Sequence, residues 1–381
     1  MMTRLGDVCT VISGSTPKTS VAEYWDGDIK WITPAELNED SFYLYDSQRH
    51  ITELGKEKTG LSYMPIGTVI LSSRAPIGKT AIAGCEMCCN QGFKNLICSD
   101  DIFNEYLYYF LKGKTDYLNS LGRGATFKEI SKSIVENIEI RLPALEEQKQ
   151  IARQFGEIYR LISLRKQQLA RLDELVKARF VELFGDTILN PFGWKKDLLG
   201  TVCDVRDGTH DSPQYYESGY PLVTSKNVTG GKIDLTDCSL ICEADFKKIN
   251  ERSKVDIGDI IMPMIGTVGK PVIVDIEPNF AIKNVSLIKF KADSRVLNTY
   301  IRALLQSDYF DDAVLSKVRG GTQKFISLGD IRKLEVLVPP MELQEQFATF
   351  IKQTDKSKVA VQKALDEAQL LFDSLMQKYF G

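Results

Sequence analysis

Short polar loops rich in glycine stand at corresponding places in the two halves of this 381-residue chain. They combine small hydroxyl side chains and backbone N–H groups, which contact phosphate, with basic and amide side chains, which contact phosphate or base edges. The alternative for any single loop is an ordinary solvated turn. As candidate nucleic-acid contacts, the first half offers Thr16, Lys18, Ser73, Arg74, Lys79, Lys94, Arg123, Thr126 and Lys128. The second half offers Thr209, His210, Lys226, Asn227, Lys270, Lys283, Arg319, Thr322 and Lys324.

The pattern Arg-Gly-x-Thr-x-Lys is the most specific of these loops. It occurs at 123–128 and again at 319–324, although neighbouring residues differ between the two copies. A lysine and an arginine beside a glycine turn suit phosphate contacts. The duplicated pattern therefore makes Lys128 and Lys324 the strongest candidates for nucleic-acid contacts.

Catalytic chemistry is poorly represented in the sequence. The chain has 2 histidines, which leaves few candidates for a general base. Gly78-Lys79-Thr80 resembles the end of a phosphate-binding P-loop, but Ser73 stands where that motif requires glycine. The second copy reads 269-Gly-Lys-Pro-271 and lacks the hydroxyl that would bind magnesium. A glycine turn that displays a lysine for a phosphate contact is the better interpretation.

Two further patterns leave alternatives open. Asn190-Pro191-Phe192 resembles part of the Asn-Pro-Pro-aromatic motif of amino methyltransferases, but the second proline is missing. A turn that ends a helix is the ordinary interpretation of this segment. Cys85-x-x-Cys88 has zinc-ligand spacing, as the pair Cys238 and Cys242 nearly has. Because these two pairs are not equivalent in the repeat, we expect small buried thiols and no metal.

Composition limits the location and the electrostatics of the protein. The net charge is −3, so a DNA-binding surface must be a local basic patch rather than a general positive field. No apolar run approaches the roughly 18 residues of a membrane-spanning helix, and the N-terminus lacks the apolar core of a signal peptide. We expect a soluble, cytoplasmic protein with no membrane partner, whose 8 cysteines are reduced.

An internal repeat organises the elements that position these loops. Residues 123–185 align with residues 319–381 without a gap, at an offset of 196, and 16 of the aligned residues are identical. The offset drifts to 194 at Leu5-Gly6 and Leu199-Gly200, and to 191 at Gly78 and Gly269. A shared frame with differing loops predicts a common scaffold that carries two different specificities.

Two long helices are predicted within the repeated part, in the segments 143–190 and 339–381. Apolar residues recur there at alternating spacings of four and three, a heptad pattern. In the first segment the pattern occupies Ile151, Phe155, Ile158, Ile162, Arg165, Leu169, Leu172, Val176, Arg179 and Leu183. In the second it occupies Phe347, Ile351, Thr354, Lys358, Val361, Leu365, Ala368, Phe372, Leu375 and Tyr379. The matching phase favours an antiparallel coiled coil about 60 Å long over two separate amphipathic helices.

The segments 1–142 and 191–338 have a different pattern of residue types. Short β-branched runs alternate there with Gly, Pro, Asn and Ser, and a few helical stretches lie between them. Each segment is predicted to be one compact domain. The expected fold class is α/β (α+β): two domains joined by two long antiparallel helices, with a pseudo-two-fold internal repeat.

The ordered motifs resemble those of the specificity subunits of type I restriction–modification systems. Gly14-Ser-Thr-Pro17 followed by Trp25 and Trp31, and Asp207-Gly-Thr-His210, look like the openings of target recognition domains of that family. Arg-Gly-x-Thr-x-Lys followed by Gln148 resembles the family's passage into its conserved helical region, and the second copy departs from it slightly at residues 339–344. The resemblance covers the whole chain, in the order domain, helix, domain, helix.

The resemblance implies target recognition domains at 1–142 and 191–338 and conserved helical spacers at 143–190 and 339–381. It implies a non-catalytic subunit that reads a bipartite, asymmetric double-stranded DNA target. The implied partners are two modification (methyltransferase) subunits and the restriction (endonuclease/translocase) subunits. No cofactor is then expected in this chain, because S-adenosylmethionine and ATP with Mg²⁺ belong to those partners. Two other functions stay open: a methyltransferase with its own recognition domain, and a coiled-coil adaptor that does not bind DNA.

Overall fold

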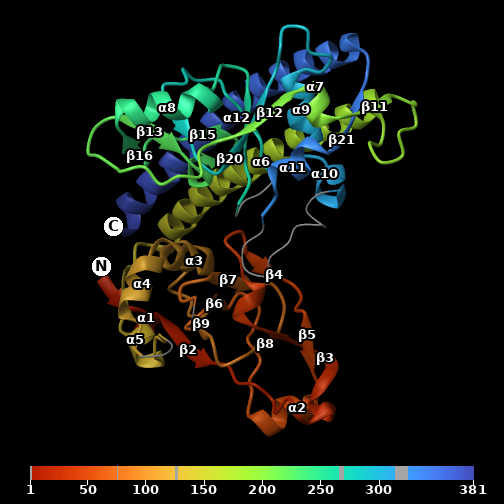
Figure 1. Ribbon diagram of the computed structural model, residues 1–381. Coiled ribbons are helices and arrows are strands. Elements are labelled where there is room, and N and C mark those ends of the chain that lie inside the picture. The colour runs from red at the N-terminus through yellow and green to blue at the C-terminus, as the bar shows by residue number, and fades with distance from the viewer. Residues whose placement is uncertain (1, 75, 125–127, 266–269, 314–324) are drawn as a thin grey trace. The chain divides into compact units, whose positions relative to one another are not determined.

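The computed structural model describes residues 2–74, 76–124, 128–265, 270–313 and 325–381. They form two compact units, the first made of Met1–Gln167 with Gln362–Gly381 and the second of Gln168–Val361. Two helices of 40 residues, α6 (Leu145–Phe184) and α12 (Met341–Phe380), each contribute residues to both units (Figure 1). Each helix begins shortly after a proline, where a missing N–H group costs no hydrogen bond.

The first unit is built on a five-stranded sheet of order β2-β9-β6-β7-β4 and a three-stranded sheet of order β5-β3-β8. The five strands are β2 (Cys9–Ser13), β9 (Lys94–Cys98), β6 (Val69–Leu71), β7 (Thr80–Ala83) and β4 (Tyr43–Leu44). The three are β5 (Arg49–Ile51), β3 (Trp25–Ile32) and β8 (Cys88–Cys89), and a separate pair is β1 (Met2–Arg4) with β10 (Glu139–Arg141). The helices are α1 (Leu5–Val8), α2 (Glu53–Thr59), α3 (Asn104–Gly113), α4 (Thr115–Leu121) and α5 (Lys132–Glu136), with 3-10 turns η1 (Ala22–Tyr24) and η2 (Pro34–Glu36).

The second unit repeats this topology. Its four-stranded sheet has the order β12 (Asp204–Asp207), β20 (Val285–Lys289), β17 (Ile260–Pro263) and β18 (Val272–Ile273). Its three-stranded sheet has the order β16 (Ser239–Ile241), β13 (Tyr220–Val223) and β19 (Ala281–Ile282). Two further pairs are β14 (Val228–Thr229) with β15 (Lys232–Ile233), and β11 (Lys195–Leu198) with β21 (Glu335–Val338). The helices are α7 (Leu199–Val202), α8 (Glu243–Ser253), α9 (Asn298–Leu304), α10 (Asp308–Ala313) and α11 (Leu328–Arg332), with η3 (Ser225–Asn227).

The strand directions match as well as the strand order. β2 and β9 pair antiparallel as β12 and β20 do, and β3 and β8 pair parallel as β13 and β19 do. The differences lie at the edges, where the first unit adds β4 and the second adds the β14–β15 hairpin. The prediction of one frame with different loops therefore describes both units.

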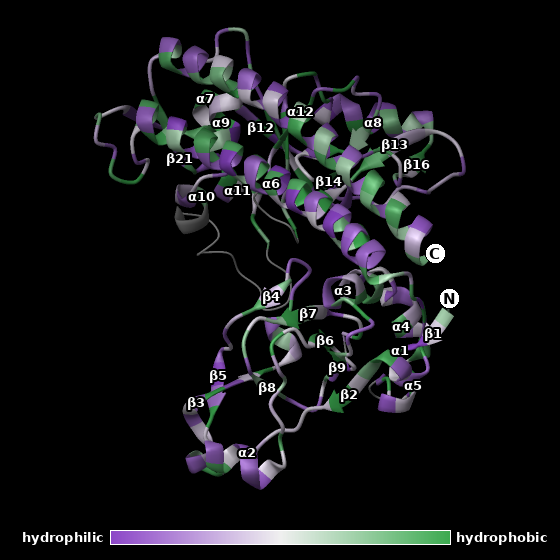
Figure 2. Ribbon diagram, turned by 180° about the vertical axis from the view of Figure 1, so that it is seen from behind, coloured by the Kyte–Doolittle hydropathy of each residue, from purple (hydrophilic) through white to green (hydrophobic). Residues whose placement is uncertain are grey.

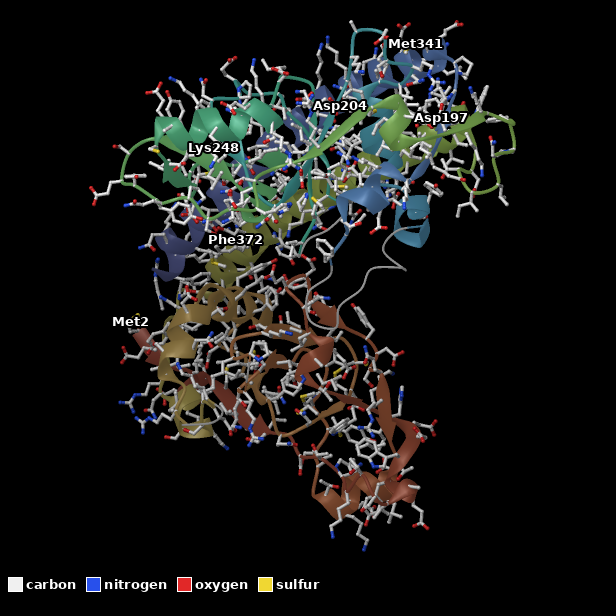
Figure 3. The ribbon with its side chains drawn as sticks, in the orientation of Figure 1. Met2, Asp197, Asp204, Lys248, Met341 and Phe372 are labelled. Carbon is white, nitrogen blue, oxygen red and sulfur yellow. The ribbon has the colours of Figure 1, made fainter. Side chains whose placement is uncertain are left out.

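The two long helices pair in opposite directions. In the first unit, Phe155 of α6 contacts Phe372 and Phe380 of α12, with ring centroids 5.3 and 5.6 Å apart. In the second unit, Phe184 of α6 contacts Phe347 of α12 at 5.5 Å. Residues near the start of one helix thus meet residues near the end of the other. Phe372 is labelled in Figure 3, and Figure 2 shows hydrophobic and hydrophilic residues alternating along both helices.

All ten heptad positions predicted on each helix are buried or half-buried. The burial of Arg165 and Arg179 at two of them extends the pattern across positions that are not apolar. The predicted α/β (α+β) class, the internal repeat and the antiparallel pairing of the long helices are confirmed.

Buried glutamines at the same place in both copies attach each long helix to its unit. Gln148, fully buried, accepts a hydrogen bond at Oε1 from the N–H group of Phe103 at 2.8 Å. Its Nε2 donates to the carbonyls of Asp101 and Pro143, both at 2.9 Å. In the second unit, Gln344 is bonded in the same way to the N–H group of Leu297 and the carbonyls of Arg295 and Pro339, at 2.8, 3.0 and 2.9 Å.

Asn190-Pro191-Phe192 lies in a turn after α6. Asn190 has a positive φ of 47° and its Oδ1 accepts a hydrogen bond from the N–H group of Trp194. Trp194 in turn donates from Nε1 to the carbonyl of Phe184, the last residue of the helix. These bonds make the segment a helix-ending turn.

The eight cysteines are free thiols. Burial raises the pKa of Cys88 to about 11, and burial first of all raises that of Cys89 to about 12. Within the described ranges, His, Cys, Asp and Glu do not gather in any group of three or more that could hold a metal ion. No helix among the same residues is both long enough and apolar enough to cross a membrane.

Candidate nucleic-acid interface

Two equivalent glycines bring the polar loops together in each unit. A Cβ atom on Gly14 would lie 2.1 Å from the carbonyl oxygen of Asn90, and one on Gly208 would lie 2.4 Å from that of Ile282. Both glycines follow the first strand of the main sheet, β2 or β12, and both cross the segment that leads into its neighbour, β9 or β20. Only glycine permits so close an approach of two backbones.

Two tryptophans hold the first of these loops. Trp31 donates from Nε1 to the carbonyl of Ser15 at 3.0 Å, and Trp25 donates from Nε1 to the carbonyl of Lys18 at 3.2 Å. The indole rings contact each other edge to face at 5.1 Å. They therefore fix the loop that carries Thr16 and Lys18, and the Thr16 hydroxyl donates to Gln91 Oε1 of the neighbouring loop. Lys18 is exposed.

Ser73, Arg74, Lys94 and Glu129 form what we call the first basic cluster. Arg74 Nε donates to Glu129 Oε2 at 2.8 Å, and Lys94 Nζ donates to Glu129 Oε1 at 3.2 Å. Lys94 also lies 3.4 Å from the hydroxyl of Ser73. The Lys94 side chain is 9% exposed and that of Arg74 is 46% exposed, so one cation supports the carboxylate from inside and the other faces solvent.

The backbone ties this cluster to the repeated Arg-Gly-x-Thr-x-Lys segment. Arg123 and Glu129 exchange two backbone hydrogen bonds of 3.0 Å, which close the segment into a loop. The N–H group of Ile130 donates to the carbonyl of Ser73, also at 3.0 Å. Arg123 and Lys128 are both exposed at the base of this loop. Two sequence-distant loops are therefore joined beside four of the predicted basic residues.

Hydrogen bonding controls the ionisation of Glu129. Burial raises the pKa of its carboxyl, but hydrogen bonds from Arg74 and Lys94 outweigh burial and hold the pKa below its usual range. The carboxylate is therefore charged at neutral pH, and it gives the exposed guanidinium of Arg74 a fixed position.

Glu129→Gln is expected to destabilise the first unit by about 1–3 kcal/mol at pH 7, because buried Lys94 loses its carboxylate partner. A folded-state pKa below the unfolded value stabilises the fold above the unfolded pKa, about 4.3, and this contribution is lost as the pH falls through the folded pKa. Urea unfolding at pH 7 and pH 3 measures the effect. A deficit of equal size at both pH values would show that the charge of Glu129 is not its source.

Asp207, His210 and Arg252 form the second basic cluster. The Asp207 side chain is 8% exposed, and its Oδ2 lies 2.9 Å from His210 Nε2. Its Oδ1 accepts a hydrogen bond from Arg252 Nη2 of α8. The side chains of His210 and Arg252 are 61% and 67% exposed. As in the first basic cluster, one carboxylate holds two basic groups, but Asp207 is more buried than Glu129, which is 32% exposed, and both of its basic partners face solvent. Figure 3 labels Asp204, the first residue of the strand that ends at Asp207.

The segment before β20 adjoins this cluster. Thr209 and Lys283 form a parallel β-bridge, and the ammonium group of Lys283, which is mostly buried, donates to the hydroxyl of Ser212 at 2.7 Å. Asn284 has a positive φ of 55°, a conformation that asparagine tolerates better than most residues. Its Oδ1 lies 2.9 Å from His210 Nδ1.

Other candidate residues lie apart from the two clusters. Asn227 is buried and caps η3, where its Oδ1 accepts from the N–H group and the hydroxyl of Thr224. Its neighbour Lys226 is exposed and lies 3.4 Å from Asp237 Oδ2. This pair of residues thus has structural partners of its own.

Lys79 and its repeat equivalent Lys270 line cavities beside the long helices. Lys79 Nζ donates to the carbonyls of Pro34 and Leu37 at 3.3 and 2.5 Å, within a cavity of about 480 Å³ that also includes Phe372. Lys270 is exposed and lines a cavity of about 790 Å³ that includes Val176 of α6. Phe372 and Val176 are themselves 196 residues apart, so the two cavities occupy equivalent places in the repeat.

Four candidates, Thr126, Arg319, Thr322 and Lys324, lie outside the described residues.

Sequence reasoning did not select Glu129, Asp207, Asn284 or Arg252 as site residues. Glu129 stands inside the repeated segment, but its counterpart is Phe325, so comparison of the two copies passes over it. Asp207 begins the Asp-Gly-Thr-His segment and Asn284 follows the candidate Lys283, so the sequence pattern could have identified both. Arg252 lies near the end of α8 in no motif, and only the fold brings it to Asp207.

Comparison with known proteins finds the same domain twice along the chain. The model of the family described as "Type I restriction modification DNA specificity domain" matches residues 1–174 and 191–368. The MjaIX specificity subunit of Methanocaldococcus jannaschii is 32% identical, over 98% of this chain and 91% of its own length. The EcoKI specificity subunit of Escherichia coli K12 is 23% identical, over 98% of this chain and 86% of its own length.

The fold has solved counterparts. The S subunit of a type I restriction–modification system from M. genitalium superposes with a TM-score of 0.59 at 15% identity, covering 100% of this chain and 96% of that one. A chain from a study of complex assembly in the type I system gives the same TM-score, 0.59, at 19% identity. The two family matches, the relatives that span nearly the whole chain and the shared fold agree, and the chain therefore belongs to the family of type I restriction–modification specificity subunits.

Proposed function

We propose that this chain is the DNA sequence-specificity subunit of a type I restriction–modification complex. The observation that carries the proposal is the match of the specificity domain to both halves of the chain. Each target recognition domain reads one half of a bipartite double-stranded DNA target, and the two long helices set the gap between the halves. The chain itself performs no chemistry, and S-adenosylmethionine and ATP with Mg²⁺ act on partner subunits.

The unlike basic clusters support an asymmetric target. The first has an arginine and a buried lysine on Glu129, whereas the second has a histidine and an arginine on Asp207. In the repeat, Arg74 and Glu129 correspond to Ile265 and Phe325, which form a β-bridge of their own. Donor groups of different geometry select different bases, so the two half-sites should differ.

The long helices carry apolar side chains that the described chain leaves half exposed or more. Leu371 of α12 and its repeat counterpart Leu175 of α6 are 51% and 50% exposed, and Leu161 and Leu370 are 50% and 71% exposed in the first unit. Exposed leucines at the equivalent positions 175 and 371 suit two copies of one partner, whereas Leu161 and Leu370 correspond to Ser357 and Glu174. We propose that two modification subunits dock on these helices and that restriction subunits join the resulting complex.

The decisive experiment is methylome sequencing of cells that carry the modification subunits with and without this chain. A bipartite adenine-methylated motif with two different halves should appear only when the chain is present. If methylation at the same motif persists without it, another protein supplies the specificity. If a single undivided motif appears, the assignment of one half-site to each domain fails.

A further inference from the structure

Asn284 is held at the surface of the second unit by bonds that use only part of its side chain. Its backbone is fixed by the N–H group, which donates to the carbonyl of Thr209 at 3.2 Å, and by its left-handed conformation. One atom of its side-chain amide lies within hydrogen-bonding distance of His210 Nδ1. Among residues 2–74, 76–124, 128–265, 270–313 and 325–381, the other amide atom has no hydrogen-bond partner. The residue is half-buried, so its position is fixed while one polar edge remains available.

The neighbouring imidazole is held between two partners. His210 Nε2 lies 2.9 Å from Asp207 Oδ2, and its Nδ1 lies 2.9 Å from the Asn284 amide. Asp207 is a carboxylate and only accepts, so Nε2 must carry a proton in either charge state of the ring. The free choice is at Nδ1, and this choice determines which amide atom of Asn284 turns toward the ring.

When Nδ1 carries a proton it donates to Asn284 Oδ1, and the amide then offers its two N–H donors outward. When Nδ1 is unprotonated, it accepts a hydrogen bond from Asn284 Nδ2, and the amide then presents its carbonyl oxygen outward. The outward N–H donors match the two adjacent acceptors N7 and O6 of guanine or the O4 acceptor of thymine in the major groove, whereas adenine offers N7 alone beside an amino donor. An outward carbonyl oxygen instead matches the amino groups of adenine or cytosine. The protonation of one histidine thus determines whether the outward edge of the Asn284 amide donates or accepts hydrogen bonds.

We propose that Asn284 reads one base in the second half-site and that His210, as a positioning residue, determines which edge of the Asn284 amide faces the DNA. This inference rests on the proposed DNA-reading function. The groups that face His210 are Asp207 of β12, Arg252 of α8 and Asn284 itself. Hydrogen bonding to Asn284 and then to Asp207 raises the pKa of His210 above its usual value of about 6.5, despite burial and the positive charge of Arg252. The donor-outward state therefore persists to a higher pH than in an isolated histidine.

The test uses the full complex of this chain with its modification subunits. It is allowed to select from duplexes with a randomised second half-site, at pH 5.5 and pH 8.5. The wild type should select guanine or thymine at one position at pH 5.5, when the ring is protonated. The preference should move toward adenine or cytosine at pH 8.5.

Asn284→Gly keeps the left-handed backbone and removes the reader. It should abolish the preference at that one position and weaken binding by about tenfold, the effect of one lost base contact. Asn284→Asp also tolerates this backbone but offers only acceptors, so it should prefer adenine or cytosine at both pH values. His210→Gln should lose the pH-dependent change in base preference, because a glutamine amide does not titrate.

His50→Gln is the matched control, since His50 is the other histidine of the chain and lies in the first unit. It should retain the wild-type selection at both pH values. Selection of an unchanged second half-site with wild-type affinity by Asn284→Gly overturns the inference. An undiminished pH-dependent change in His210→Gln overturns the role of His210. Failure of the wild-type complex to select any sequence would instead overturn the proposed function.

Discussion

Gln148→Glu should destabilise the first unit by about 3 kcal/mol or more. The amide nitrogen that it replaces donates to two buried carbonyls, those of Asp101 and Pro143. A carboxylate has no donor to offer them and places negative charge against both oxygens, in a site where the side chain is fully buried. Protonation of the new carboxyl restores at most one of the two bonds, so the loss remains large at any pH.

The chain contains its own controls for this experiment. Gln150 lies on the same helix, is exposed and is also repeated in the second copy, so Gln150→Glu should leave stability within about 0.5 kcal/mol of wild type. Gln344→Glu should destabilise the second unit instead, because Gln344 makes the equivalent three hydrogen bonds there.

Amide hydrogen exchange separates the two units, because each variant should loosen only the unit to which its glutamine is bonded. A carboxylate at position 148 or 344 can still accept from the N–H group of Phe103 or Leu297, so the increase in exchange comes from local opening and not from loss of that bond. Gln148→Glu should increase exchange around Phe103 and α3, and Gln344→Glu should increase it around Leu297 and α9. Equal protection of Phe103 in Gln148→Glu and wild type would contradict the assignment of this bond network as the attachment of α6 to the first unit.

The long helices could be predicted in detail because their pattern is periodic and duplicated. A heptad spacing specifies which side chains face a partner, and the matching phase of the two copies specifies that the partner is the other helix. Even Arg165 and Arg179, which lack apolar side chains, were placed correctly by register alone. The domain frame was predicted less sharply, since its strands are short and their order depends on pairings between distant residues.

Residue type alone did not determine which polar side chains gather. Lys79 and Lys94 both follow glycine-containing turns, yet the ammonium of Lys79 turns to the carbonyls of Pro34 and Leu37, whereas that of Lys94 reaches Glu129. The direction of a long side chain depends on tertiary neighbours that no local pattern encodes. The carboxylates Glu129 and Asp207 went unselected for a related reason, because reasoning from DNA contacts favours cations and overlooks the acids that position them.

Insertion of one heptad into each long helix should lengthen the gap of the recognised target and leave both half-sites unchanged. The suitable places are after Gln167 in α6 and after Val361 in α12, where each helix passes from one compact unit to the other. Seven residues add about 10.5 Å to each helix, which corresponds to about three base pairs of duplex at ~3.4 Å each. A copy of the preceding seven residues preserves the buried pattern, so both units keep their packing.

Binding to the original target should fall to the non-specific level, about a thousandfold or more weaker, because only one half-site is then in register. Methylome sequencing should report the same two half-sequences with the longer gap. Five-residue insertions at the same places are the matched control: they turn the buried face by about 140° and should abolish both stable pairing and methylation. A heptad variant that recognises altered half-sequences, or the original gap, would show that the helices do not measure the target. Because the heptad variant changes length without changing either basic cluster, it separates the spacing of the target from the reading of its bases.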